Sequence, residues 1–231
     1  MNVLIKNLGH GIKNVIINEP KTYNSLSFKT LSELLKSFKK LDKDNYTKVI
    51  ILEGAEKGFS AGHNLKEIRS LNKKSKYLKL FNLCSKLMLQ IVEGRKPVIA
   101  KIHGAAYAAG CQLIASCDLA YSTNTATFAT PGVNIGLFCS TPMVAISRKV
   151  NRKNMMKMLL TGELIKANHA KKIGLINDHF SESKLNNEVL KLAKKIASKS
   201  NLVIKIGKKA FYRQLEMPLR KAYIYSSKMM T

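Results

Sequence analysis

The stretch Lys96-Pro-Val-Ile-Ala-Lys-Ile-His-Gly-Ala-Ala-Tyr-Ala-Ala-Gly-Cys-Gln-Leu-Ile-Ala-Ser-Cys-Asp118 predicts a buried strand, then a loop of small residues, then a helix. The same order occurs earlier, where Lys48-Val-Ile-Ile-Leu-Glu-Gly54 precedes the loop Phe59-Ser-Ala-Gly-His-Asn-Leu-Lys-Glu67. Continuous apolar runs of this length are typical of strands that are buried on both faces. Strand, loop and helix therefore alternate, and the sequence predicts an α/β fold.

The segments outside these two units support the same fold class. Near the N-terminus, Val3–Ile5 and Ile12–Ile17 predict a hairpin that turns around Gly9 and Gly11. Ser27 then precedes a helix whose apolar positions recur at helical spacing: Leu31, Leu34, Leu35, Phe38 and Leu41.

In the rest of the chain, expected helices and strands alternate at first, and the last part is expected to be helical. A helix is expected over about 75–92, and short strands are expected over 119–121 and 127–129. From Val144 onward the pattern is nearly all helical, with breaks near 198–201 and at Pro218. Because no linker or low-complexity tract interrupts it, we expect one domain over 1–231.

Composition narrows the class of protein. The chain has 231 residues, of which 45% are hydrophobic, and no apolar run reaches the roughly 20 residues of a membrane span. The first 20 residues lack the pattern of a signal or transit peptide, so we expect a cytoplasmic location. The four cysteines form no CxxC pair and match no histidine spacing; we expect buried thiols and no metal site.

The net charge of +26 would attract any polyanion. Lysines occur throughout the chain, as the composition of a strongly AT-rich genome would also produce. No arginine-rich tail, aromatic RNA-binding motif or zinc finger accompanies the charge. We therefore do not expect nucleic acid to be the partner.

The two loops of small residues are the best candidates for chemistry. Small side chains before a helix let a ligand approach the backbone, and the first N–H groups of a helix have no partner within it. Two such helix starts facing one point would bind an anion or an oxyanion. By pattern alone, tight packing is the more usual explanation of such turns.

These loops resemble the two oxyanion-hole segments of the crotonase (enoyl-CoA hydratase/isomerase) family. Further resemblances follow in order along the chain: Asn24-Ser-Leu26, Phe128-Ala-Thr-Pro-Gly132 and Leu160-Thr-Gly-Glu163 before Ala167–Leu175. The similarity extends from about Asn2 to Ser226, and several segments most resemble one subgroup of the family. The fold that this implies is a spiral of ββα turns over about 1–180 with a helical trimerisation part over about 181–231, assembled as a homotrimer or hexamer.

The resemblance also implies roles for individual residues. The two oxyanion donors would be the backbone N–H groups of His63 and Ala109, which would stabilise the enolate of an acyl-CoA thioester. The CoA and pantetheine path would be lined by Ala61, Asn64 and Leu65. Lys21 and Lys66 are candidates for the nucleotide phosphates, or are simply solvated charges. Coenzyme A would arrive with the substrate, so no separate cofactor is expected.

Two positions depart from the family pattern. Hydratases of the family use two glutamates for acid and base chemistry, and here these positions are Gln112 and Gly132, neither of which ionises. We expect either an enoyl-CoA hydratase/isomerase-like enzyme (a lyase) of fatty-acid metabolism or an acyl-CoA-binding protein without turnover. Gln112 could orient a water or a carbonyl by hydrogen bonding. His63 could contribute its imidazole, while Asp118 is expected to be structural.

A third departure is at the C-terminus. The family's Glu-Gly-x-x-Ala-Phe-like helix and Lys-Arg-x-Pro-like end do not follow Met229, and the sequence stops at Thr231. Because that segment helps close the acyl-CoA site in the family, we expect the helical part to be incomplete. A shortened, inactive relative of the enzymes is therefore also possible.

Overall fold

The computed structural model describes all residues from 1 to 231. Its main sheet has six strands, in the order β1-β2-β3-β4-β6-β9. Their bounds are β1 Val3–Asn7, β2 Ile12–Ile17, β3 Val49–Gly54, β4 Val98–Ile102, β6 Leu119–Thr123 and β9 Asp178–Phe180. Strands β1 and β2 form the expected antiparallel hairpin, and all other neighbours are parallel.

A second, smaller sheet lies at the carboxyl end of this arrangement. It is built from β5 Ala105–Tyr107, β7 Thr127–Ala129 and β8 Ile165–Lys166. Strand β5 pairs in parallel with β7, and β8 is antiparallel to β7. This sheet carries the chain from the end of β4 into the loop that was singled out in the sequence.

The helices cover both faces of the main sheet. In chain order they are 3₁₀ helix η1 Pro20–Thr22, α1 Phe28–Lys43, α2 Leu65–Ser70, α3 Lys74–Glu93, α4 Ala109–Ser116, 3₁₀ helix η2 Pro131–Ile135, α5 Ser140–Ile146, α6 Arg152–Thr161, α7 Ala167–Lys172, α8 Glu182–Ala197, α9 Asn201–Gln214 and α10 Leu219–Met230. None of them combines the length and apolar character that crossing a membrane requires.

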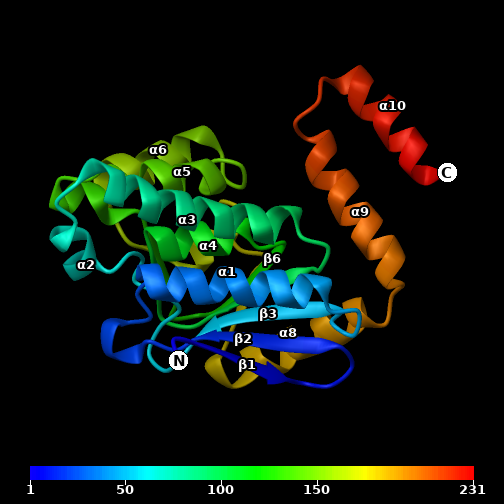
Figure 1. Ribbon diagram of the computed structural model, residues 1–231, viewed down its shortest axis with the longest axis horizontal. Coiled ribbons are helices and arrows are strands. Elements are labelled where there is room, and N and C mark those ends of the chain that lie inside the picture. The colour runs from blue at the N-terminus through cyan, green and yellow to red at the C-terminus, as the bar shows by residue number, and fades with distance from the viewer.

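Two hydrophobic clusters hold these layers together. Helices α1, α3 and α4 lie on one side of the main sheet in Figure 1, and their apolar faces form the larger cluster with the strands. Helix α8 covers the opposite face, where Leu185 and Val189 pack against Ile12, Val49 and Ile99. The continuous apolar runs of β3 and β4 are explained by this double coverage.

Helix α1 begins where the sequence predicts. The Ser27 hydroxyl accepts a hydrogen bond from the Thr30 N–H, which satisfies one of the free donors at the helix start. All five apolar positions expected to face the core, from Leu31 to Leu41, are buried. The prediction for this helix is confirmed.

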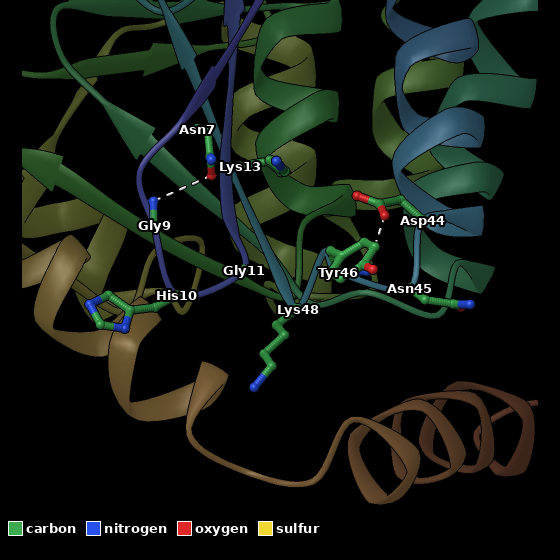
Figure 2. A pocket seen from close by; sticks show the side chains of 9 residues that line it. All are labelled: Asn7, Gly9, His10, Gly11, Lys13, Asp44, Asn45, Tyr46 and Lys48. Carbon is green, nitrogen blue, oxygen red and sulfur yellow. Dashed lines mark hydrogen bonds between the residues drawn. The ribbon is translucent and has the colours of Figure 1, made fainter.

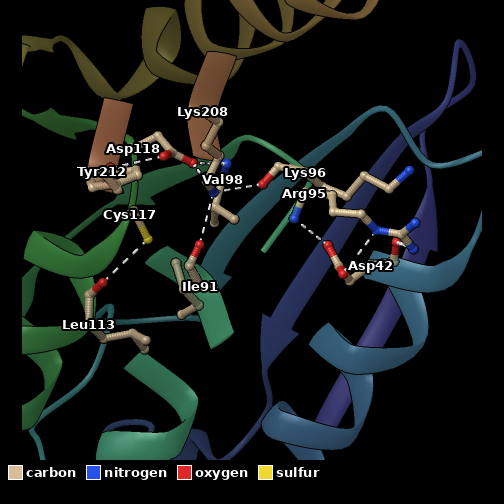
Figure 3. Close-up of polar contacts among 10 residues, drawn as sticks. All are labelled: Asp42, Ile91, Arg95, Lys96, Val98, Leu113, Cys117, Asp118, Lys208 and Tyr212. Atoms are coloured by element: carbon tan, nitrogen blue, oxygen red, sulfur yellow. Dashed lines mark hydrogen bonds and ion pairs between the residues drawn. The ribbon is translucent and has the colours of Figure 1, made fainter. Parts of the chain in front are cut away.

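The last two helices form an arm that extends away from the body, with the C-terminus at its tip (Figure 1). Helix α9 has no fully buried residue, and α10 buries only Ala222. A polar cluster attaches the arm: Lys208 Nζ donates to Asp118 at 2.7 Å and to the carbonyl oxygens of Ile91 and Lys96 (Figure 3). Tyr212 donates its hydroxyl to the same carboxylate.

Asp118 therefore has a structural role, as expected. Its Oδ2 also accepts from the Val98 N–H, so one carboxylate links β4, the end of α4 and α9. The Lys208 side chain is only 7% exposed and that of Asp118 17%. Buried cations of this kind are stable only when all their donors are satisfied, and Lys208 meets that condition with three acceptors.

Two sequence predictions were wrong in detail. The chain after Val144 is not nearly all helical, because β8 and the edge strand β9 interrupt it. Likewise, residues 105–113 are not one loop: β5 occupies 105–107, and α4 begins at Ala109. These strands have two or three residues each, and they exist through pairing with distant β6 and β7, which local patterns do not reveal.

Candidate functional site

The first loop is held in place by a buried asparagine. Asn24 Nδ2 donates to the carbonyl oxygens of Ala55 and Gly58, both at 2.7 Å. The Ser60 hydroxyl donates back to the Asn24 carbonyl, and Leu26 N–H donates to Gly62 O at 2.7 Å. The segment after η1 thus fixes the path of the loop from Ala55 to Gly62.

This loop is also paired with β5. The N–H groups of Phe59 and Ser60 both donate to Ala105 O, and Tyr107 N–H donates to Ser60 O at 2.9 Å. Gly62 lies so close that a methyl group added there would be 2.9 Å from Tyr107 O and 3.2 Å from Ala109 N. A side chain at Gly110 would likewise collide with Ser60 O. The two small-residue loops are therefore in direct contact.

The second loop turns into α4 through a strained residue. Ala108 has φ 47° and ψ −113°, a backbone conformation that non-glycine residues rarely adopt. Strain of this kind costs about 1–3 kcal/mol and is concentrated at functional sites. Here it is held by the hydrogen bond from Ala108 N–H to Ala129 O.

Two backbone donors in these loops have no partner. Neither the N–H of His63 nor that of Ala109 makes a hydrogen bond within the protein. Ala109 is the first residue of α4, so its N–H has no acceptor in the helix and carries the positive end of the helix dipole. Unpartnered buried N–H groups are rare, and a pair in touching loops could hold one oxygen atom.

The imidazole of His63 turns toward the protein interior. Its Nδ1 lies 3.3 Å from Leu26 O, and its ring meets Phe81 edge to face, with centroids 5.4 Å apart. Burial lowers the pKa of His63 below its ordinary value, so the ring is neutral near pH 7. The side chain packs beside the site, while the backbone N–H of the same residue remains free.

Gln112 lies within the first turns of α4 and is 3% exposed. Its Oε1 is 3.9 Å from the Cys84 sulfur, and its Nε2 has no hydrogen-bond partner. Because Gln112 follows Ala109 by three residues, it is on the same helix face one turn later. Helical side chains lean toward the N-terminus of their helix, which brings this amide toward the free N–H of Ala109.

Gly132 leaves no room for a side chain. It is buried in η2, and a methyl group added there would lie 2.5 Å from Leu137 O and 2.9 Å from the sulfur of Cys139. The space that a side chain at position 132 would need is thus occupied by the backbone that follows it. Placing a larger residue here would require moving residues 137–139.

The thiols near this position are un-ionised. All four cysteines are free and buried, as predicted. Burial raises the pKa of Cys111 to about 12 and also raises the pKa of Cys139. Like the neutral imidazole of His63, these thiols carry no charge near pH 7.

The other expected site residues surround the first donor. Ala61 and Leu65 are exposed, and Asn64 caps α2 by accepting from Glu67 N–H. Lys66 is exposed in α2. Lys21 is exposed in η1. The residue after η1, Tyr23, accepts a hydrogen bond from Ala61 N–H at its carbonyl oxygen, so Lys21 is also near the first loop. No ion pair engages either lysine.

A cavity of about 560 Å³ lies elsewhere, as Figure 2 shows. It is lined by Asn7, Gly9, His10, Gly11, Lys13, Asp44, Asn45, Tyr46 and Lys48. These residues precede or flank the amino ends of β2 and β3, whereas the donor loops follow the carboxyl ends of β3 and β4. The cavity therefore contains no part of the candidate site.

Comparison with known proteins decides the family. The family described as Enoyl-CoA hydratase/isomerase matches residues 7–231. The chain belongs to the enoyl-CoA hydratase/isomerase family. It is 44% identical over 220 residues to human enoyl-CoA hydratase domain-containing protein 3, mitochondrial, covering 95% of this chain and 73% of the relative. That protein represents the subgroup that the sequence segments resemble.

Solved structures of the same family confirm the crotonase fold. An enoyl-CoA hydratase from Mycobacterium smegmatis matches with a TM-score of 0.98 at 41% identity, covering 100% of this chain and 90% of that one. Human enoyl-CoA hydratase domain-containing protein 3 matches with a TM-score of 0.96 at 42% identity, with the same coverage. The word mitochondrial in the relative's name applies to that protein, and the cytoplasmic location expected here stays a prediction.

Two residues that matter to the candidate site were not predicted to do so. In the sequence, Asn24 stood out only as part of a family motif. In the structure it is buried, and its four hydrogen bonds fix the first loop. Ala108 gave no signal, because alanine in a run of small residues does not reveal a positive φ. For Asn24, the only hint in the sequence was its place shortly before the helix expected after Ser27.

The closed space at Gly132 generates a stability prediction. Gly132→Ala should lower the free energy of unfolding by about 1–3 kcal/mol, because its methyl group meets a backbone oxygen that cannot easily move. Gly207→Ala is the matched control: nothing lies within 4 Å of the added group, and it lies inside α9, so stability should rise by up to about 1 kcal/mol. Urea denaturation measures both, and equal stabilities of the two variants would contradict the closed space.

Proposed function

We propose that this protein binds acyl-CoA thioesters and places the thioester oxygen between the N–H groups of His63 and Ala109. The observation that carries the proposal is the pair of unpartnered backbone donors in two touching loops. Membership of the enoyl-CoA hydratase/isomerase family supports the choice of ligand. Backbone donors do not depend on side-chain identity, so the unusual His63 at the first position is compatible with this role.

In this proposal the donors stabilise an enolate. When a thioester loses an electrophile or a proton at Cα, negative charge develops on its oxygen, and each donor of such a site is worth about 3 kcal/mol in the transition state. The α4 dipole adds to the stabilisation, since the oxygen would sit at the helix start. Activity in acyl-CoA and fatty-acid metabolism follows, with coenzyme A supplied by the substrate.

The remaining contacts to coenzyme A are assigned by position. Ala61, Asn64 and Leu65 would line the pantetheine path beside the first donor. Lys21 in η1 and Lys66 in α2 would meet the phosphates of the nucleotide. Both lysines are exposed, so their contribution should weaken as salt concentration rises.

A second candidate function is binding without turnover. It is favoured by one specific observation: the two acid/base positions are an amide and a glycine whose space is closed. Such a protein would hold acyl-CoA in the same place and release it unchanged. Both candidates require the oxygen to rest on the same two donors.

The contribution of the thioester oxygen to binding can be tested with the unaltered protein. Butyryl-CoA should bind about 10- to 30-fold more tightly than S-butyl-CoA, a thioether that lacks only the carbonyl oxygen, because two hydrogen bonds of about 1 kcal/mol each are lost. Isothermal titration calorimetry measures both dissociation constants. Equal affinities, or binding of neither compound, would contradict the proposal.

A variant of Ala109 tests whether its N–H group contacts the thioester oxygen. Ala109→Pro removes one N–H at a helix position that accepts proline, and should reduce the preference for the thioester at least several-fold. Circular dichroism shows whether the variant is folded. If it is not, the comparison of thioester and thioether in the unaltered protein still decides the question.

We also propose that the protein assembles as a homotrimer. Large apolar side chains are exposed on two surfaces: on the arm, Leu202, Val203, Phe211, Leu215, Leu219, Tyr223 and Ile224, and over η2, α5 and α6, Ile135, Leu137, Phe138, Val144, Met156 and Leu160. Many large apolar side chains exposed on neighbouring elements are typical of subunit interfaces. A second copy of the chain is the occupant that the family resemblance favours.

Sedimentation velocity tests the assembly. The expected species is three chains of 25.8 kDa each. Leu219→Glu, which places a charge in the exposed apolar surface of α10, should shift the protein toward monomer. Arg220→Glu, at the neighbouring exposed position, should leave the assembly intact. A monomer at all micromolar concentrations would contradict the proposal.

A further inference from the structure

The cavity of Figure 2 lies at the amino ends of β2 and β3, apart from the two donor loops. Its volume is about 560 Å³, and basic side chains line it, among them Lys13, Lys48 and His10. The only phenol ring at this cavity is that of Tyr46, which is 86% exposed. All other lining residues are polar or glycine, so the cavity suits a charged ligand rather than an acyl chain.

The backbone fixes the shape of this cavity. Lys48 N–H donates to Gly11 O at 2.7 Å, which joins the turn of the β1–β2 hairpin to the segment before β3. Gly11 has φ 76°, and a methyl group added there would lie 2.6 Å from Tyr46 O and 2.7 Å from the Cγ atom of Lys48. The two walls are therefore in direct contact, and the cavity exists before any ligand binds.

A groove of about 130 Å³ continues from this cavity. It shares Asn45 and Lys48 with the cavity and runs between the start of β4 and the first turn of α9. No carboxylate lines it, and four of its nine lining residues are basic: Lys48, Arg95, Lys96 and Lys205. Lys205 belongs to the arm, whereas the other three belong to the body. The junction of arm and body is thus lined by positive charge on both sides.

Most of these positive charges have no ionic partner. Arg95 is paired with Asp42, with its Nε 3.2 Å from the carboxylate. The lysines of the cavity and groove form no ion pair: Lys13, Lys48, Lys96 and Lys205. Partial burial, and then the charge of Arg95, lower the pKa of Lys96 below its ordinary value. Like charges held close together are destabilising until an anion binds among them.

The two carboxylates near these lysines are already engaged. Asp42 accepts from the backbone N–H and the side chain of Arg95. Asp44 accepts from the Thr47 hydroxyl at 2.6 Å and from the Tyr46 N–H at 3.0 Å. The charges of both carboxylates raise the pKa of Lys96, yet that pKa stays below its ordinary value. They therefore offset only part of the positive charge of the junction.

We infer that this junction binds a small oligophosphate, a compound with two or more linked phosphate groups. Linked phosphates carry several negative charges along a short chain, so one ligand contacts several lysines at once. The bound ligand would connect Lys48 and Lys96 of the body with Lys205 of the arm. It would thereby strengthen the attachment that Lys208, three residues further along α9, makes to Asp118 (Figure 3). This inference is independent of the acyl-CoA binding proposed above.

Titration calorimetry with inorganic tripolyphosphate, at constant ionic strength, tests the site. Lys48→Ala should weaken binding about tenfold, because Lys48 lines both the cavity and the groove. Lys153→Ala is the matched control: it removes the same charge from an exposed position of α6 and should leave binding unchanged. Equal effects of the two substitutions, or no binding by the unaltered protein, would overturn the inference.

A second variant tests the contribution of the arm. Lys205→Ala, at an exposed position of α9 that does not pack against Gly11, should also weaken tripolyphosphate binding several-fold. Hydrogen–deuterium exchange should slow over 44–48 and over 201–205 when tripolyphosphate binds. Slower exchange confined to other segments would place the anion elsewhere and contradict the inference.

ATP distinguishes two sources of the phosphate chain. ATP and tripolyphosphate both carry three linked phosphates, but only ATP adds a base that can stack on the exposed Tyr46 ring. If ATP binds more tightly and Tyr46→Ala removes the advantage, the ligand is a nucleotide. Equal or weaker binding of ATP assigns the site to the phosphate chain alone, and either result supports an oligophosphate site.

Competition separates this site from the acyl-CoA site, since coenzyme A itself carries phosphates. Saturating tripolyphosphate should leave the affinity for butyryl-CoA unchanged at constant ionic strength, and so should Lys48→Ala. One-for-one competition between the two ligands would overturn the inference, because both would then occupy one site. If butyryl-CoA does not bind at all, the proposed function fails, while the comparison of Lys48→Ala with Lys153→Ala still decides this inference.

Discussion

The contact between the loop Phe59–Gly62 and strand β5 is the constraint on which the site depends. Three hydrogen bonds join Phe59 and Ser60 to Ala105 and Tyr107, and they leave no space for a side chain at Gly62 or Gly110. The loops follow neighbouring parallel strands, β3 and β4, so the sheet itself brings them to one edge. Backbone pairing then sets the distance between them, and two N–H groups remain free as a result.

A site made of backbone groups keeps its function when side chains change. The imidazole of His63 packs against Phe81, while the backbone N–H of the same residue stays free. Position 112 is a glutamine and position 132 a glycine, and neither residue engages the free N–H groups of His63 and Ala109. The strain at Ala108 costs about 1–3 kcal/mol, which would be unnecessary in a loop that served only to connect β5 with α4.

Much of the fold could be predicted from the sequence because local patterns were strong. The apolar runs of β3 and β4, the cap at Ser27 and the apolar face of α1 each depend on residues close together in the chain. The short strands β5, β8 and β9 could not be predicted in this way, because pairing with distant segments creates them. For the same reason the closed space at Gly132 was invisible: it comes from Leu137 O and Cys139, whose approach depends on the turn after η2.

The vibrational frequency of the bound thioester carbonyl tests the central claim most directly. Infrared difference spectra of butyryl-CoA with and without a ¹³C label at the carbonyl isolate that one band in the complex. Two converging N–H donors and the start of α4 polarise the carbonyl, so the band should move to lower frequency than in water, and less far in a folded Ala109→Pro variant. A bound carbonyl that absorbs at or above its frequency in water would contradict the two-donor site.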